Sequence, residues 1–200
     1  MRIEAMADKL SKYISKNLEL SLMEEKKLYY EILLILLSLI KIICIFAVSI
    51  LFECFVQCFL IVMVFSAFKT FTGGYHCNKY YKCLISGVVL FNVSAYLSKR
   101  IYLNSYNLLN IQISISLLFI CLCLTYYPIE NPIKPLKIEK TNIKKILVSL
   151  LVLYNVIYTV LFNYYPKYLA PYIAGFCLNI IFSLPLGNKL LLLIDSLSLK

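Results

Sequence analysis

Long apolar runs that carry almost no charge constrain this chain more than any other feature of its sequence. They cover, with soft ends, residues 29–52, 54–68, 83–98, 106–127, 146–162 and 169–186. A helix needs about 20 apolar residues to cross the hydrocarbon core of a bilayer, so each run is long enough, or nearly so, to span a membrane. The chain is 62% hydrophobic and only 15% charged, whereas a soluble domain is about half apolar and a quarter charged. The sequence therefore predicts an all-α integral membrane protein.

The number of transmembrane helices depends on how the first two runs are joined. Separate helices give about six spans, whereas one long bent helix interrupted at Glu53 gives about five. Residues 1–28 carry apolar side chains at helical spacing opposite Lys and Asp, which predicts an amphipathic helix on the membrane surface. They lack the compact apolar core of a cleavable signal peptide. We expect a single membrane domain over residues 1–200, in contact with the lipid bilayer.

The distribution of basic residues predicts the orientation of the chain. With the larger span count and a cytoplasmic N-terminus, only Lys99, Arg100 and Lys167 lie outside, and Lys41 lies within a span. Cytoplasmic loops of membrane proteins carry an excess of Lys and Arg. We therefore expect both termini and residues 69–82 to lie on the cytoplasmic side of the cell membrane. The same rule accounts for the net charge of +10, so no nucleic-acid partner is expected.

Residues 128–145 are predicted to form a stiff, basic cytoplasmic loop. Pro128, Pro132 and Pro135 interrupt helices, and the lysines of this stretch avoid the bilayer core. The loop could be a topology determinant that contacts anionic lipids, or it could dock an acidic peptide segment.

Residues 69–83 carry the side chains with catalytic chemistry. His76 is the only histidine of the chain; it follows the adjacent Gly73 and Gly74, and Cys83 lies seven residues further on. A cysteine protease needs a thiolate and an imidazole, which accepts the thiol proton and later donates a proton to the leaving amine. His76 and Cys83 supply this minimum.

His76 and Cys83 can meet only if they are not on one straight helix. On such a helix they would be about 10.5 Å apart along the axis, too far for a hydrogen bond. We therefore expect a helix that begins between them with Asn78 as its N-cap. The flexible Gly73 and Gly74 would then let His76 fold back over Cys83.

Positive potential near Cys83 favours its thiolate form. The predicted helix N-terminus, Lys79 and Lys82 supply this potential. No Asp or Glu lies between Glu53 and Glu130, so the group that orients the imidazole stays open. The candidates are a backbone carbonyl and the polar side chains of Asn78, Asn92 and Gln57.

The motif Gly-Gly-x-His, with Cys seven positions after the histidine, resembles the accessory gene regulator B (AgrB) family of basic membrane proteins. The resemblance extends to the amphipathic N-terminus, the Pro- and Lys-rich residues 128–145 and the pair Leu184-Pro185. It implies a membrane cysteine endopeptidase of peptide quorum sensing. Such an enzyme trims the C-terminal tail of a small AgrD-like precursor peptide and cyclises the remainder, through a peptidyl thioester, to a thiolactone or lactone autoinducing peptide. It also implies a homodimer.

The resemblance assigns roles to individual residues. Cys83 would be the nucleophile and His76 the general base and acid, whereas Gly73-Gly74 and Asn78 would support the site. Arginine is common in the family at the position of Lys69, and lysine keeps the charge without the planar fork that binds a carboxylate. A contact between Lys69 and an acidic substrate tail would therefore be looser, or be made elsewhere.

Other functions fit parts of the sequence. Cys77, His76 and Cys83 could bind a metal ion, but a zinc site normally has four ligands in recognisable spacing, so we expect no metal and no cofactor. No cysteine pair has the Cys-x-x-Cys spacing of a thiol oxidoreductase. A non-enzymatic peptide transporter or scaffold could line a path with the polar residues of its spans, which are Lys41, Glu53, Asn92, Asn155 and Asn179.

Overall fold

The computed structural model describes residues 2–18, 20–73, 80–100, 105–128 and 140–184. Helices form the regular structure of these residues, and no strand occurs among them. The all-α fold predicted from the sequence is confirmed. In chain order the elements are α1 (Arg2–Leu18), α2 (Leu22–Leu51), α3 (Phe55–Thr72), α4 (Tyr80–Arg100), α5 (Ser105–Thr125), α6 (Lys140–Tyr164), the 3-10 helix η1 (Pro166–Tyr168) and α7 (Leu169–Ser183).

The chain divides into two compact units, Met1–Ala47 and Val48–Lys200. The first unit contains α1 and most of α2, and the second contains the end of α2 and all later helices. The single domain expected over residues 1–200 stays a prediction.

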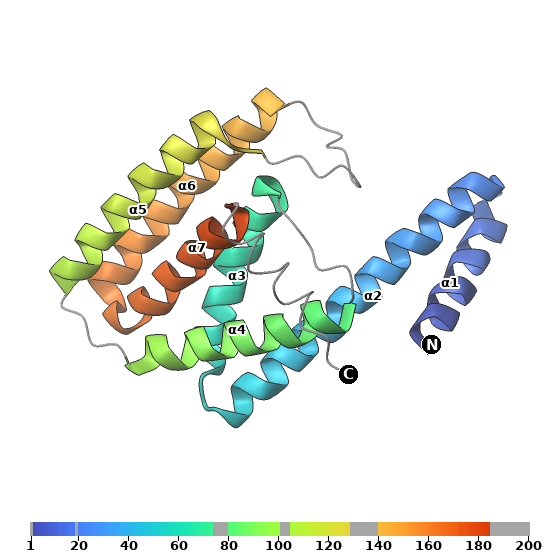
Figure 1. The fold of residues 1–200 in the computed structure, drawn as a ribbon, viewed down its shortest axis with the longest axis horizontal. Coiled ribbons are helices and arrows are strands. Elements are labelled where there is room, and N and C mark those ends of the chain that lie inside the picture. Colours follow the sequence, from blue (N-terminus) through green and yellow to red (C-terminus); the bar gives the residue numbers. More distant parts are fainter. Residues whose placement is uncertain (1, 19, 74–79, 101–104, 129–139, 185–200) are drawn as a thin grey trace. The chain divides into compact units, whose positions relative to one another are not determined.

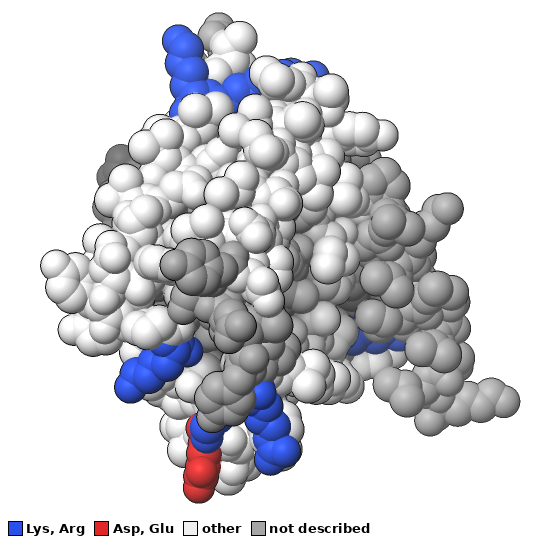
Figure 2. Space-filling model, turned by 90° about the vertical axis from the view of Figure 1, so that its left-hand side faces the viewer, with Lys and Arg blue, Asp and Glu red and all other residues white. Residues whose placement is uncertain are grey.

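Helices α2 to α6 are long and apolar enough to cross a membrane, which gives five candidate spans among the described residues. The sixth predicted span corresponds to α7, which has 15 residues, fewer than the about 20 that a span normally takes. Many large apolar side chains point outward, including Val152 at 60% exposed and Leu117 at 59%. Figure 2 shows a broad area of uncharged side chains with few Lys or Arg side chains among them. Lipid is the solvent that such a surface requires.

In the first unit, α1 packs against α2 through small residues. Ala7, Ser11 and Ser15 are buried, and the Ser15 hydroxyl donates a hydrogen bond to Glu25 of α2 (3.0 Å). Met6 and Tyr13 remain 55% and 70% exposed. The predicted amphipathic helix is present, and its apolar side chains are available to contact lipid.

Helix α2 begins earlier than its apolar run because Ser21 and Glu24 form a capping box. The Glu24 carboxylate accepts hydrogen bonds from the backbone N–H (2.9 Å) and the hydroxyl (2.7 Å) of Ser21. These bonds satisfy donors that a helix N-terminus leaves unpaired. Polar residues before the apolar run are therefore already helical.

Helices α2 and α3 are separate elements, which decides between the two predicted arrangements. Glu53 has a φ of 51°, a conformation uncommon for residues other than glycine. The Cys54 N–H donates to the Ser49 carbonyl (2.9 Å), and Lys99 of α4 donates to the Glu53 carbonyl (2.7 Å). Glu53 thus forms the turn between the two helices.

The core of the second unit is an aromatic cluster around Phe176 of α7. Its ring centroid lies 4.7 Å from that of Phe68 (α3), 4.9 Å from Phe119 (α5) and 4.4 Å from Tyr154 (α6). Four helices therefore meet at one side chain. In Figure 1, α5 and α6 lie side by side, and α7 packs against both of them and against α3.

Helices α3 and α7 approach each other closely at Gly175. A Cβ atom at this position would lie 2.7 Å from the Ile61 carbonyl oxygen and 3.0 Å from Ile61 Cα and Val64 Cβ. Only glycine allows the backbones to come this near. The pairing of α3 with α7 positions the end of α3, where the candidate site begins.

Candidate functional site

The predicted catalytic segment, residues 69–83, joins α3 to α4. Helix α3 ends at Thr72, Gly73 follows it, and the described part of α4 begins at Tyr80, three residues before Cys83. Four of the predicted site residues lie outside the described residues, namely Gly74, His76, Cys77 and Asn78. The pairing of His76 with Cys83, the N-cap at Asn78 and the metal alternative therefore stay predictions.

Gly73 ends α3 in a backbone conformation suited to glycine. Its φ is 73° and its ψ is −150°, and its N–H donates to the Lys69 carbonyl (3.3 Å). A side chain at this φ and ψ would clash with the backbone, so residues other than glycine rarely adopt it. The backbone conformation at position 73 therefore explains why this residue is a glycine, whatever its part in catalysis.

Cys83 is partly exposed near the start of α4. The N–H groups of a helix N-terminus favour a negative charge nearby. Lys82, predicted to contribute positive potential, is only 6% exposed. The position of Cys83 on its helix is compatible with a reactive thiolate.

Lys69 contacts the end of α7. Its Nζ donates a hydrogen bond to the Phe182 carbonyl (2.9 Å). A cation next to the C-terminal carbonyls of a helix is stabilised by the helix dipole. In this structure Lys69 joins two helices, and a contact with a substrate tail stays a prediction.

A buried polar cluster lies beside the site, and the sequence did not indicate it. Thr72 Oγ1 accepts hydrogen bonds from Ser183 Oγ (3.1 Å) and Asn179 Nδ2 (3.4 Å). All three residues are 0% exposed, and we call them the α3–α7 cluster. The sequence carries a signal for two of the three, because Asn179 and Ser183 are polar residues four positions apart and so share one face of the otherwise apolar α7.

Tyr127, directly after α5, belongs to the same region. It is 2% exposed, and its ring centroid lies 5.5 Å from that of Phe119. Burial raises the pKa of its phenol to about 12, and the nearby Ser183 hydroxyl opposes this shift. The group therefore stays neutral at physiological pH.

The polar residues considered for a transport path belong to different networks. Asn155 accepts hydrogen bonds from Gln112 (3.0 Å) and Ser116 (3.2 Å), between α5 and α6. Asn179 instead bonds with Thr72, between α7 and α3. The side-chain bonds of Asn155 and those of Asn179 therefore join different pairs of helices, and each set accounts for helix packing.

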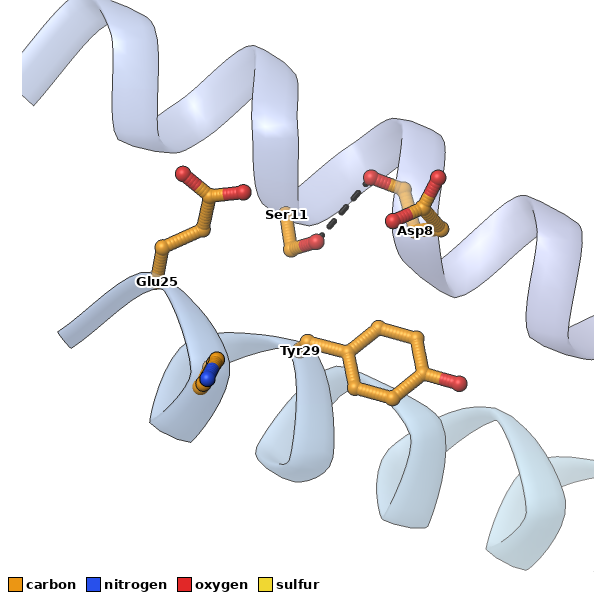
Figure 3. Close-up of a pocket in the computed structure, with 5 residues that line it drawn as sticks. Asp8, Ser11, Glu25 and Tyr29 are labelled. Atoms are coloured by element: carbon orange, nitrogen blue, oxygen red, sulfur yellow. Dashed lines mark hydrogen bonds between the residues drawn. The ribbon is translucent and has the colours of Figure 1, made fainter. Parts of the chain in front are cut away.

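A pocket of 260 Å³ lies between α1 and α2 in the first unit. Figure 3 shows Asp8 and Ser11 of α1 on one side of it and Glu25 and Tyr29 of α2 on the other. Its carboxylates are engaged, because Asp8 pairs with Lys12 (2.8 Å) and Glu25 accepts from Ser15. Within the described part of the chain, no group of three His, Cys, Asp or Glu side chains could hold a metal ion.

Outward-facing apolar helices, with a Cys at the start of one of them, define a multi-pass membrane protein with a candidate thiol site. The family described as Accessory gene regulator B matches residues 7–184, most of the chain, including residues 69–83. The chain belongs to this family, AgrB, whose members are membrane proteins of accessory gene regulator peptide processing. Membership implies a precursor peptide as substrate. Comparisons with curated proteins and with solved structures gave no match.

Proposed function

We propose that the protein is a membrane cysteine endopeptidase that removes the C-terminal tail of a small precursor peptide and cyclises the remainder. The observation that carries this proposal is membership of the AgrB family, in a chain that keeps Cys83 seven residues after its only histidine. The location of Cys83 near the start of α4 supports it, since a helix N-terminus favours the thiolate.

In the first step, His76 takes the proton of the Cys83 thiol and the thiolate attacks the scissile carbonyl. A carbon–sulfur bond forms, the peptide carbon–nitrogen bond breaks, and the imidazolium gives its proton to the leaving amine. The products are the free C-terminal tail and a thioester between the remaining peptide and Cys83.

In the second step, a Cys or Ser side chain within the bound peptide attacks the thioester. The new thiolactone or lactone closes a ring, the carbon–sulfur bond to Cys83 breaks and Cys83 leaves as the thiolate, while His76 takes the proton of the attacking thiol or hydroxyl. No oxidant, metal or cofactor enters either step. Closure to a thiolactone exchanges one thioester for another, and closure to a lactone exchanges the thioester for an ester, so the acyl group stays activated for this step provided that water is kept from the intermediate.

The remaining residues of the segment would position these groups. Gly73-Gly74 would let the chain turn sharply between α3 and the residues around His76, and Asn78 would cap α4. We further propose that the enzyme is a homodimer and that residues 69–83 face the cytoplasm, where most of the basic residues would lie.

Cleavage of the small peptide encoded beside this gene tests the proposal. In membrane vesicles, the unmodified protein should release the tail, while Cys83→Ala and His76→Ala should release none although they insert normally. Cys121→Ala is the matched control, because Cys121 is an exposed free cysteine on α5; it should keep full activity. Cleavage that survives Cys83→Ala would end the protease proposal and leave the transporter or scaffold.

A further inference from the structure

The α3–α7 cluster is unusual because it places three polar side chains inside an otherwise apolar contact. Thr72, Asn179 and Ser183 are fully buried, and the same two helices meet further along at Gly175 and Ile61 without polar side chains. A buried polar group left unpaired costs about 1–3 kcal/mol, so most such groups have partners. Among the described residues the hydroxyls of Thr72 and Ser183 pair with each other, whereas Asn179 Oδ1 has no hydrogen-bond partner. The cluster therefore depends on one relative position of the two helix ends.

The bonds of the cluster converge on the last residue of α3. Thr72 Oγ1 accepts from both Ser183 (3.1 Å) and Asn179 (3.4 Å), while Asn179 Nδ2 also lies 3.5 Å from the Phe65 carbonyl. One turn earlier, Lys69 donates to the Phe182 carbonyl. Two successive turns of α3 are thus bonded to the C-terminal end of α7.

Thr72 is also the residue from which the catalytic segment departs. Gly73 follows with its positive φ, and His76 is four residues after Thr72 along the chain. Four residues span at most about 14 Å, so the position of Thr72 limits where His76 can lie. Cysteine protease chemistry is sensitive to displacement of its catalytic groups, since a shift of about 1 Å can cost a factor of about 100 in rate.

We propose that Asn179 and Ser183 are positioning residues for the catalytic segment, acting through the Thr72 hydroxyl to hold the end of α3 in place. This inference rests on the proposed protease function. It assigns α7, which supplies no residue of the predicted site, a part in setting the geometry of that site.

The contribution of the Thr72 hydroxyl can be tested separately from the contribution of the side chain's shape. Thr72→Val keeps the shape and removes the hydroxyl, whereas Thr72→Ser keeps the hydroxyl and removes the methyl group. With full-length protein in nanodiscs, and rates expressed per folded molecule, Thr72→Val and Ser183→Ala should lower kcat about tenfold or more with KM changed less than about twofold. Thr72→Ser should retain kcat.

Ser116→Ala is the control, because it removes a part-buried hydrogen bond between α5 and α6, away from α3 and α7. It should leave kcat unchanged. A second readout is the rate at which N-ethylmaleimide modifies Cys83, followed by mass spectrometry across pH. In the variants that lose kcat, the rate of Cys83 modification should also lose the pH dependence that comes from titration of the His76 imidazole.

The outcomes separate this inference from the proposed function. Unchanged kcat in Thr72→Val and Ser183→Ala, together with an inactive Cys83→Ala, would overturn the inference alone. Equal losses in Thr72→Ser and Ser116→Ala would also overturn it, because they would indicate general destabilisation. Full cleavage by Cys83→Ala would instead remove the proposed function on which the inference rests.

Discussion

The backbone conformation at position 73 strongly favours glycine. With φ at 73° and ψ at −150°, the position lies in a region that side chains disfavour by about 1–3 kcal/mol. Its N–H still bonds to the Lys69 carbonyl, so it ends α3 and directs the next residues at the same time. Gly73 therefore ends α3 within the predicted catalytic segment.

Gly73→Ala should lower the free energy of unfolding by about 1–3 kcal/mol because alanine is strained in this conformation. Unfolding by denaturant in mixed micelles measures the change. Thr70→Ala, in the same turn of α3, should change stability by less than about 0.5 kcal/mol. Equal stability of Gly73→Ala and the unmodified protein would show that the strain is absent.

Helices α3 and α7 form the element pair that supports the site. Their contact needs Gly175, since a Cβ there would meet the Ile61 carbonyl at 2.7 Å. Gly175→Ala should therefore separate the helices and destabilise the protein by about 1–3 kcal/mol, although alanine normally favours a helix. Thermal unfolding in detergent checks this, with the 43% exposed Ile181→Val as control. A stabilised Gly175→Ala would contradict the observed packing.

The existence of the helices could be predicted from the sequence, but several of their ends could not. The predicted loop over residues 128–145 includes residues 140–145, which form the start of α6. Hydropathy excludes Lys140, Lys144 and Lys145 from a span, yet the i→i−4 hydrogen bonds of a helix continue through polar residues outside the bilayer core. Helix α2 likewise begins before its apolar run, because polar residues ahead of that run are still helical.

The candidate site was predictable in part. The motif around His76 and Cys83 could be recognised because its residues are close in sequence, and those residues are enough to indicate the family. The α3–α7 cluster could not be predicted, because Thr72 and Ser183 are 111 residues apart. Only the packing of α7 on α3 shows that Asn179 bonds to Thr72.

For the whole molecule, the central question is which side of the membrane the site faces. Helix α6 supplies a direct marker, because its 25 residues extend about 37 Å, more than the about 30 Å of a hydrocarbon core. Exposed Lys145 lies near its start, and exposed Lys167 follows its end in η1. The proposed orientation places Lys145 inside and Lys167 outside.

Cysteine labelling checks this orientation in a background in which the eight native cysteines are replaced. Lys167→Cys should react with an impermeant maleimide in intact cells, whereas Lys145→Cys should react only after permeabilisation. The basic residues near the start of α6 favour the cytoplasm for the same reason as other cytoplasmic loops. The reverse labelling pattern would place residues 69–83 outside and contradict a cytoplasmic site.

The most direct test of the central claim is detection of the thioester between the precursor peptide and Cys83. A precursor whose ring-closing Cys or Ser is replaced by Ala should be cleaved once and remain attached to the enzyme. Mass spectrometry of the digested protein should then find the trimmed peptide on the fragment that contains Cys83, and on no other cysteine. Tail release with no adduct at Cys83, and with undiminished rate in Cys83→Ala, would contradict the account.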